Sequence, residues 1–327
     1  MSDLRRSVSV ALCTYNGERY VEEQLGSILA QSTAVREIVV SDDASSDGTI
    51  ALVEKAAAAM PGDVAFQLLR NAPGLGVVRN FEQAVSATTA EIVALSDQDD
   101  VWHPDKLDTV LGVLEAHPEV AFVHTDARLV DADGAPLGST LFDYLEVSAD
   151  VLDEEESARG FETLLRRNLA TGATVVFRRS LLEQALPFPE EWVHDEWLAV
   201  IAAATARVGV VRRPTVDYRL HGSNEIGVAA PTLRNKVGRV LDADGSRNRL
   251  LAAKFAVLAE RLRALDVAPS LVELADAKAA FERRRAELPS SRPRRVPTVL
   301  RMARAGLYGS FASQGRMDVV RDLLRRP

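Results

Sequence analysis

Short β-branched runs alternate with amphipathic helical stretches through the first two hundred residues. Val21, Leu25 and Ile28 fall on one face of a helix, and Leu107, Val110, Leu111 and Leu114 do the same after Pro104. This alternation predicts an α/β fold with a mostly parallel central sheet covered by helices on both faces. The predicted strands are Val8–Cys13, Glu37–Ser41, Val64–Leu69, Ile92–Ser96 and Val120–His124.

Polar residues follow the first four predicted strands. The carboxyl ends of parallel strands meet at one edge of a sheet, so we expect these residues to surround one crevice. Each turn taken alone is equally compatible with a structural role, for example with Ser45 or Asp47 capping the next helix. The four clusters are Thr14–Gly17, Asp42–Thr49, Asn71–Asn80 and Ser96–Asp100.

Three carboxylates stand together in the last of these clusters. Asp97, Asp99 and Asp100 repel one another unless positive charge lies among them. Hard divalent cations such as Mg²⁺ take oxygen ligands, commonly one or two carboxylates plus substrate phosphates. The cluster therefore predicts a site for a divalent cation, Mg²⁺ or Mn²⁺, that carries a diphosphate.

Other classes of site are excluded by pattern. Gly74 and Gly76 are not followed by the third glycine of a dinucleotide fingerprint, and there is no P-loop signature. Cys13 is the only cysteine, which excludes an internal disulfide and cysteine-rich metal sites. No uncharged apolar run approaches the roughly 18 residues of a membrane span, and the N-terminus does not read as a signal peptide. We therefore expect a cytoplasmic protein.

Charge divides the chain into two parts. Residues 1–230 carry 18 Lys and Arg against 37 Asp and Glu, whereas residues 231–327 carry 21 against 10. We predict one domain over 1–230 and a basic helical extension over 231–327. Pro289, Pro293 and Pro297 predict an Arg-rich linker inside the extension. The basic amphipathic end is compatible with contact with an anionic membrane, and equally with a helical bundle or a homodimer. Nucleic acid is not expected, because the first part is strongly acidic.

The ordered motifs resemble one enzyme family. Thr14-Tyr15-Asn16-Gly17, Asp42-Asp43, Asp97-x-Asp99-Asp100, His194-Asp195-Glu196-Trp197 and Tyr218-Arg219-Leu220-His221 are similar to those of the family-2 inverting glycosyltransferases. The resemblance covers about residues 7–225 and implies the GT-A nucleotide-diphospho-sugar transferase fold. The rhamnosyltransferase-like enzymes of bacterial cell-surface polysaccharide synthesis are the branch that it resembles most.

The resemblance assigns roles to individual residues. Asp195 matches the catalytic base, although His194 stands where the family has Glu, and Glu196 is a rival base. Asp99 and His221 match the metal ligands, Asp97 the carboxylate near the ribose, and Asp43 the contact to the nucleotide base. The residues that the resemblance implies for substrate binding are Thr14, Tyr15, Asn16, Asp42, Asp43, Asn71, Arg79, Asn80, Asp97, Thr171, Gly172 and Trp197.

The implied activity is metal-dependent, inverting transfer of one sugar. The donor would be a UDP- or dTDP-sugar, dTDP-rhamnose among them, and the acceptor a hydroxyl of a glycan or lipid-linked glycan. Processive members carry a Q-x-x-R-W motif that is absent here, which favours single-sugar addition. The alternatives are a nucleotidyltransferase, which normally has a glycine- and lysine-rich N-terminal signature, and a catalytically inactive nucleotide-sugar-binding module.

Overall fold

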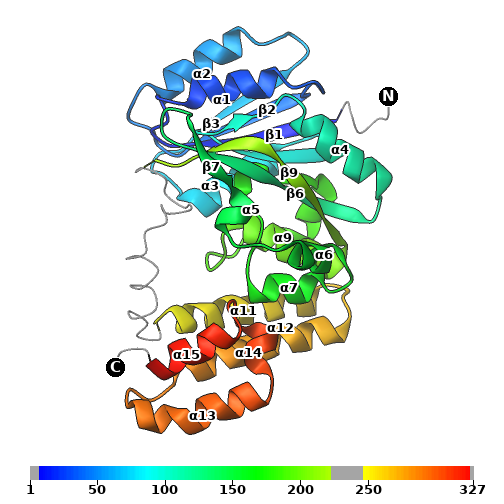
Figure 1. Ribbon diagram of the computed structural model, residues 1–327. Helices are drawn as coiled ribbons and strands as arrows, with labels where there is room; N and C mark the ends of the chain where they lie inside the picture. Colours follow the sequence, from blue (N-terminus) through cyan, green and yellow to red (C-terminus); the bar gives the residue numbers. More distant parts are fainter. Residues whose placement is uncertain (1–6, 222–245, 325–327) are drawn as a thin grey trace. The chain divides into compact units, whose positions relative to one another are not determined.

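The computed structural model describes residues 7–221 and 246–324 of the chain (Figure 1). It divides into two compact units, one of Met1–Ala158 with Leu169–Gly227 and one of Arg159–Asn168 with Val228–Pro327. Helix α7 (Gly160–Arg166) thus belongs with the C-terminal helices, although it precedes the predicted boundary. The boundary at residue 230 itself lies outside the described residues.

The first unit is built on one sheet, which has nine strands among the described residues. Its order is β3-β2-β1-β4-β8-β6-β9-β5, and β7 pairs with β6 outside this path. Four of the five predicted strands match within one residue, and the fifth continues to Val130. The strands are β1 Val8–Thr14, β2 Glu37–Asp42, β3 Ala65–Arg70, β4 Ile92–Asp97, β5 Val101–Trp102, β6 Val120–Val130, β7 Pro136–Thr140, β8 Val176–Arg178 and β9 Arg207–Arg219.

The sheet is parallel only in part. The predicted parallel arrangement is present in β3, β2, β1 and β4. Beyond β4 the sheet is mixed: β8 runs antiparallel to both β4 and β6, while β6 and β9 are parallel. The mixed part was not predicted, because β8 has only three residues and its pairing is decided by contacts far along the chain.

Helices cover both faces of the parallel part, as the alternation predicted. Figure 1 shows α1 and α2 above β1–β3 and α3 below them, and α3 packs on β1 and β2. The predicted face of α1, with Val21, Leu25 and Ile28, is buried. The helices of this unit are α1 Val21–Leu29, α2 Thr49–Ala58, α3 Val77–Ala87, α4 Lys106–Ala116, α5 Leu141–Tyr144, α6 Ala149–Glu156, α8 Leu182–Ala185 and α9 His194–Thr205, with 3₁₀ turns η2 Gly172–Thr174 and η3 Arg179–Leu181.

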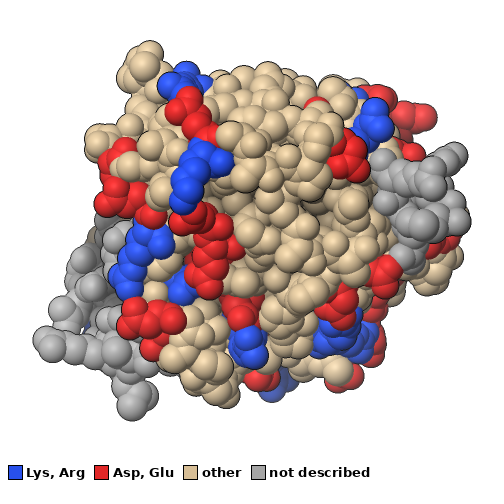
Figure 2. All heavy atoms as spheres, turned by 90° about the horizontal axis from the view of Figure 1, so that it is seen from above, with Lys and Arg blue, Asp and Glu red and all other residues tan. Residues whose placement is uncertain are grey.

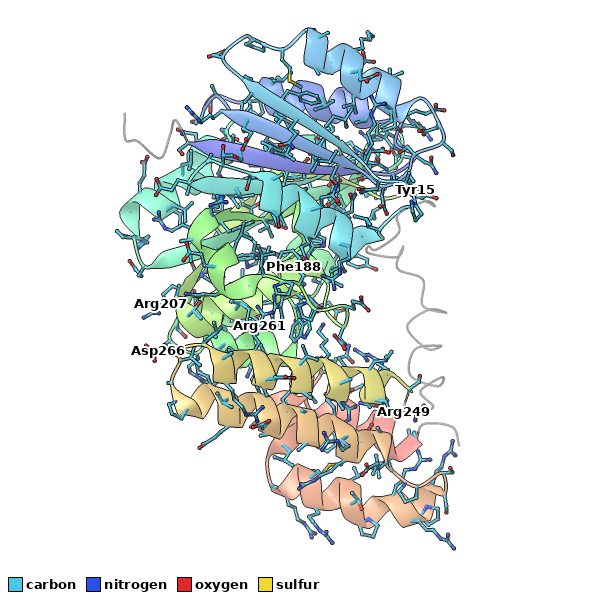
Figure 3. All side chains as sticks on the ribbon, turned by 180° about the vertical axis from the view of Figure 1, so that it is seen from behind. Tyr15, Phe188, Arg207, Arg249, Arg261 and Asp266 are labelled. Carbon is cyan, nitrogen blue, oxygen red and sulfur yellow. The ribbon has the colours of Figure 1, made fainter. Side chains whose placement is uncertain are left out.

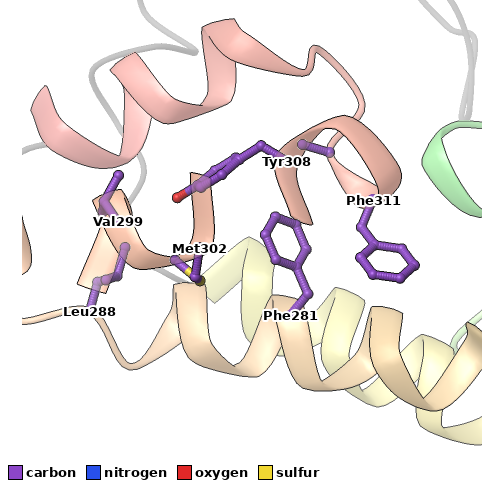
Figure 4. Close-up of a cluster of buried hydrophobic side chains, with 7 residues drawn as sticks. Phe281, Leu288, Val299, Met302, Tyr308 and Phe311 are labelled. Carbon is purple, nitrogen blue, oxygen red and sulfur yellow. The ribbon is translucent and has the colours of Figure 1, made fainter. Parts of the chain in front are cut away.

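The second unit is a helical bundle with its own apolar core. Phe281, Val299, Met302, Tyr308 and Phe311 are buried against one another (Figure 4). These side chains come from three different helices, so the core holds the unit together. Besides α7, the helices are α11 Ser246–Ala264, α12 Pro269–Ala286, α13 Arg292–Arg304, α14 Leu307–Phe311 and α15 Arg316–Leu324.

The predicted Arg-rich linker is wrong, because α13 spans most of it. Pro293 lies in the first turn of the helix, where proline removes no helical hydrogen bond. Arg295 is buried and donates to the carbonyls of Pro289 and Ser290, at 2.9 and 2.6 Å. This side chain fixes the start of α13, and the sequence pattern gave no sign of it.

Surface charge and helix length bear on contact with membranes. Figure 2 looks onto the α1 and α2 side and shows basic and acidic side chains next to one another. Lys55 and Glu22 form one such pair at 2.7 Å.

No helix in the described part of the chain is long and apolar enough to cross a membrane.

Candidate functional site

The carboxyl ends of the parallel strands bring the predicted polar clusters to one edge of the sheet. In the strand register Thr14 lies opposite Asp42, and Cys13 lies opposite Asp97. Tyr15, the first residue after β1, projects an exposed side chain here (Figure 3). The predicted clustering of strand ends is therefore present.

Asp42 supports the loop after β2. Its Oδ1 accepts hydrogen bonds from the hydroxyls of Thr14, at 2.8 Å, and Ser45, at 2.6 Å. Its Oδ2 accepts from the Ser45 N–H at 2.9 Å, and the residue is buried. Both carboxylate oxygens thus accept hydrogen bonds from the protein, and these bonds hold the loop after β2 against the end of β1.

Two further side chains tie the loops together. Asn16 has a φ of 47°, and its side-chain oxygen accepts from the Ser46 N–H at 2.8 Å. Gln98 accepts from the Tyr15 N–H at 2.8 Å and donates to the Tyr15 carbonyl at 2.9 Å. Gln98 therefore clamps the end of β1 to the end of β4. Sequence reasoning had given it no role.

Asp43 faces the loop after β3. Its carboxylate accepts from the backbone N–H groups of Leu75 and Gly76, the latter at 2.9 Å. A Cβ added at Gly74 would lie 3.0 Å from the Asp43 carbonyl, and Gly76 has a φ of 79°. The two glycines let this loop fold closely over Asp43.

Asn71, Asn80 and Arg79 line the same region in different ways. Asn80 is buried. Its side-chain oxygen accepts a hydrogen bond from the Ser41 hydroxyl at 2.6 Å and another from the Asn71 side-chain amide at 3.0 Å. Arg79 is more open and pairs with Glu82 at 2.8 Å. Asn80 is therefore a structural link between β2 and α3, whereas the Arg79 guanidinium remains near the surface.

Asp97 and Asp195 lie in one electrostatic environment. Burial, and after it the negative charges of Asp99 and Asp195, raise the pKa of Asp97 to about 7, while the positive charge of Lys106 opposes them. Asp195 is buried in the first turn of α9, and its Oδ1 accepts from the Glu196 N–H at 2.6 Å. The η2 turn lies beside Asp97, because a Cβ added at Gly172 would be 3.6 Å from Asp97 Oδ2. Thr171 immediately precedes that turn.

Asp99 and His221 are paired although 122 residues separate them. The distance from His221 Nε2 to Asp99 Oδ2 is 2.8 Å. The His221 ring stacks on Tyr20, with centroids 5.0 Å apart. Arg219 donates from Nε to the Asp99 carbonyl at 2.8 Å and from its backbone N–H to Asp100 at 2.9 Å. These contacts bring the end of β9 to the carboxylate cluster.

The Asp99–His221 pair fits a divalent cation. A carboxylate oxygen and an imidazole nitrogen are ligands that Mn²⁺ accepts, and the carboxylate suits Mg²⁺. Within residues 7–221 and 246–324, no group of three such side chains converges to hold a metal. A cation held by this pair would therefore complete its coordination with other ligands, such as diphosphate oxygens and water.

Lys106 is a component that sequence reasoning missed. It is fully buried in α4, donates to the Ala173 carbonyl at 2.6 Å and lies 3.8 Å above the Trp102 ring. Burial lowers its pKa to about 7, against the opposing effect of Asp100 and Asp97. Its spacing of four residues before Val110 places it on the apolar face of the helix, and this signal could have identified it.

Trp197 does not belong to the site surface. It is fully buried, and its indole N–H donates to the Ala185 carbonyl at 2.7 Å. Trp192 packs against it with ring centroids 5.4 Å apart. We withdraw it from the predicted substrate-binding set, because no face of the ring is left for a ligand.

Comparison with known proteins identifies one family. The model of glycosyl transferase family 2 matches residues 9–185. An uncharacterised protein of Mycobacterium tuberculosis is 29% identical over 219 residues, 65% of this chain and 59% of that protein. The chain thus spans less than two thirds of this relative. The dTDP-rhamnosyl transferase RfbG of Shigella flexneri is 26% identical over 229 residues, 66% of this chain and 73% of that protein.

Solved structures share the fold. S. aureus TarS 1–349 in complex with UDP-GlcNAc superposes with a TM-score of 0.59 at 18% identity, covering 84% of this chain and 72% of that one. The mannosyltransferase PcManGT of Pyrobaculum calidifontis, in complex with GDP-Man and Mn²⁺, gives 0.54 at 23% identity, covering 97% and 86%. At these identities the likeness concerns the fold, which is the predicted GT-A fold.

Proposed function

The chain belongs to glycosyl transferase family 2, and from this premise we propose that it is a glycosyltransferase that performs a metal-dependent, inverting transfer of one sugar. The donor is a UDP- or dTDP-sugar, with dTDP-rhamnose the first candidate. The acceptor is a hydroxyl of a glycan or lipid-linked glycan in cell-surface polysaccharide synthesis. The name of the Shigella relative, a dTDP-rhamnosyl transferase, supports this donor.

One observation carries the proposal. The Asp99–His221 pair and Asp97 stand at the carboxyl end of the parallel strands, and Asp195 from a different element lies close enough to raise the Asp97 pKa. Inverting transfer needs such a division: charge stabilisation where the diphosphate leaves, and a separate carboxylate for the acceptor.

Each group has a defined part in the displacement. Asp99 and His221 would hold the cation, which when bound neutralises charge developing on the leaving diphosphate. Asp195 accepts the proton of the acceptor hydroxyl as its oxygen attacks the anomeric carbon. Asp97 is proposed to lie beside the nucleotide, and the buried Lys106 is its counter-charge. The Mn²⁺ in the PcManGT structure supports a cation in this role.

Asp43 is proposed to bind the nucleotide base. Its carboxylate lies at the edge of the sheet and accepts hydrogen bonds from two backbone N–H groups of the Leu75–Gly76 loop. A pyrimidine ring N–H offers the same chemistry. The UDP-GlcNAc bound in the TarS structure supports a pyrimidine nucleotide.

Contact with an anionic membrane is proposed for helix α13. It carries five arginines and no acidic residue, and Arg294, Arg301 and Arg304 are exposed. None of these three has an ion pair within the described residues. Val296 and Leu300 on the same helix are 38% and 40% exposed. Arginines interleaved with exposed apolar side chains suit the surface of an anionic bilayer, where a lipid-linked acceptor would lie. A homodimer through this face is the alternative.

A screen of nucleotide sugars tests the proposed activity. We expect UDP- or dTDP-sugars to raise the melting temperature of the protein in the presence of Mn²⁺ and to do so less in chelator. Hydrolysis of the same donor without acceptor would exclude an inactive binding module. Pyrophosphate release from a nucleoside triphosphate would instead favour the nucleotidyltransferase alternative.

A further inference from the structure

Tyr20 is a half-buried aromatic residue beside the proposed cation ligands, and the proposed function gives it no role. It lies at the start of helix α1, and its backbone N–H donates to the Gly17 carbonyl at 3.0 Å. The His221 imidazole stacks on its ring, with centroids 5.0 Å apart and 26° between the planes. The Arg219 guanidinium lies 4.8 Å from the centre of the same ring. The last residue of β9 and the residue two positions after it thus contact one aromatic ring of α1.

Arg219 connects the start of α1 to the carboxylate cluster. Its side chain is 4% exposed. It donates from Nη2 to the Glu23 carboxylate of α1 at 2.8 Å and from Nε to the Asp99 carbonyl at 2.8 Å. A guanidinium carries its donor N–H groups in one rigid plane, so both bonds are made in a fixed geometry. Arg219 therefore keeps the first turn of α1, and with it the Tyr20 ring, against the loop that carries Asp99.

The stack of His221 on Tyr20 is compatible with a bound cation, whereas the hydrogen bond between His221 and Asp99 is not. His221 Nε2 lies 2.8 Å from Asp99 Oδ2. An imidazole nitrogen that ligates a metal does so through its lone pair, so a cation at Nε2 would replace this hydrogen bond. The stack uses the face of the imidazole and does not involve its nitrogens. Tyr20 is thus a contact that orients His221 both with and without the cation.

We propose that Tyr20 is a positioning residue for the cation site, and that its ring holds the His221 imidazole in the orientation in which Nε2 faces Asp99. Tyr20 acts through His221 and makes no bond to the cation itself. An imidazole nitrogen suits Mn²⁺, whereas Mg²⁺ prefers oxygen ligands, so the role of Tyr20 is greater for Mn²⁺. This inference rests on the proposed function, because it takes Asp99 and His221 to be the cation ligands.

The gain in nucleotide affinity that a cation brings measures this role without turnover. Calorimetric titrations give the Kd for dTDP and for UDP in excess chelator, with Mn²⁺ and with Mg²⁺. Tyr20→Leu and Tyr20→Met both remove the aromatic ring and keep an apolar side chain. We expect wild-type nucleotide affinity in chelator and a gain with Mn²⁺ that is about tenfold smaller, the effect of losing a residue that orients a metal ligand. The gain with Mg²⁺ should fall less.

Tyr20→Phe is the matched control, because it keeps the ring and removes only the hydroxyl. We expect wild-type affinities under all three conditions. A double-mutant cycle with His221→Ala shows whether Tyr20 acts through that histidine. In the His221→Ala background, Tyr20→Leu should cause no further loss of the gain with Mn²⁺.

Four results would overturn the assignment. The first is a wild-type gain with Mn²⁺ in both variants that lack the ring. The second is equal weakening of nucleotide binding in chelator and in Mn²⁺, which would indicate a purely structural role. The third is a loss in Tyr20→Phe as large as that in Tyr20→Leu, and the fourth is a further loss in the His221→Ala background. A wild-type protein whose nucleotide affinity is unaffected by either cation is a separate result, which contradicts the proposed metal requirement and with it this inference.

Discussion

At the scale of single residues, the carboxylates at the edge of the sheet differ in the groups that they contact. Asp42 and Asn80 have their polar atoms occupied by neighbouring side chains and backbone. Within the described residues, the Asp99 carboxylate is hydrogen-bonded to one side chain, that of His221. Asp195 accepts a hydrogen bond from the Glu196 backbone N–H, and Asp43 accepts one from the Gly76 backbone N–H. The predictions at this scale concern these last three carboxylates.

Loss of the Asp99 carboxylate should abolish transfer. Asp99→Asn keeps the size of the side chain but weakens its bond to a hard cation. We expect no measurable transfer, an unchanged circular dichroism spectrum, and loss of wild-type activity in excess chelator. Undiminished turnover in chelator would contradict the metal requirement.

Asp195 should carry the proton transfer. Removing a general base typically costs about 10²–10⁴-fold in rate. We expect Asp195→Asn to lower kcat by that order while the Kd for the donor stays nearly unchanged. Glu196→Gln is the matched control, and we expect a far smaller effect. If Glu196→Gln is the damaging change, the assignment of the base is displaced by one residue.

Asp43 should contribute to binding of the nucleotide base. A hydrogen bond to a charged group contributes about 1.5–3 kcal/mol, so Asp43→Ala should weaken UDP or dTDP binding by that amount. Calorimetric titration with the free nucleotide measures the effect directly. Wild-type affinity in the variant would remove Asp43 from the proposed site.

At the scale of elements, the second unit is held together by buried ions as well as apolar side chains. Arg285 of α12 donates to Asp322 of α15 at 2.8 Å and to Asp318 at 3.3 Å. The Tyr308 hydroxyl also donates to Asp322, at 2.6 Å, and all four residues are buried. These contacts hold α15 against α12. Arg285, Asp318 and Asp322 are thus charged residues of the extension that serve its internal packing.

Breaking this buried cluster should destabilise the second unit. Asp322→Ala leaves the Arg285 guanidinium buried with fewer partners, and loss of one member of a buried pair costs about 3–5 kcal/mol. Scanning calorimetry should show the transition of the second unit at a lower temperature. Asp276→Ala is the control, because it breaks an exposed pair with Arg263, and such pairs contribute about 0–1 kcal/mol. Equal effects of the two variants would contradict the structural role of the cluster.

At the scale of the whole molecule, charge is distributed between the units. The basic excess of residues 231–327 is not uniformly available, since Arg285 and Arg295 are buried. The exposed arginines of α13 are still available for contact with a membrane. A truncation near Arg295 would cut through α13 and remove part of the core around Val299 and Met302. Surface substitutions are therefore the better test of membrane contact.

The full-length protein should sediment with anionic phosphatidylglycerol vesicles at low salt and be released as salt rises. Each basic residue near an anionic membrane contributes about 1 kcal/mol to the free energy of binding. The combined change Arg294→Gln, Arg301→Gln and Arg304→Gln should therefore lower the affinity for the vesicles about a hundredfold. The control removes the same charge from the first unit through Arg36→Gln, Lys55→Gln and Arg70→Gln, and should bind nearly as the wild type. Equal loss in both variants, or no vesicle binding at any salt concentration, would contradict this role of α13 and favour a packing or dimerisation face.

The sequence by itself determined the parallel half of the sheet and the residues at its edge. Strand and helix periods are local properties, so Val8–Thr14 and the buried face of α1 could be predicted without knowledge of the rest of the chain. The family motifs then predicted the carboxylates, and the parallel pairing brings Asp97 beside the end of β1.

Only the tertiary structure decided how these polar residues are used. Residues distant in sequence decide that Asp42 is hydrogen-bonded to Thr14 and that Trp197 is buried. They also decide that the His194 ring nitrogens have no hydrogen-bond partner among the residues that the structure describes. No local period exists for such properties. The same reason applies to the three-residue strand β8, whose antiparallel pairing with β4 and β6 makes the second half of the sheet mixed. Local patterns predict the elements, whereas hydrogen-bond satisfaction and burial are settled by long-range packing.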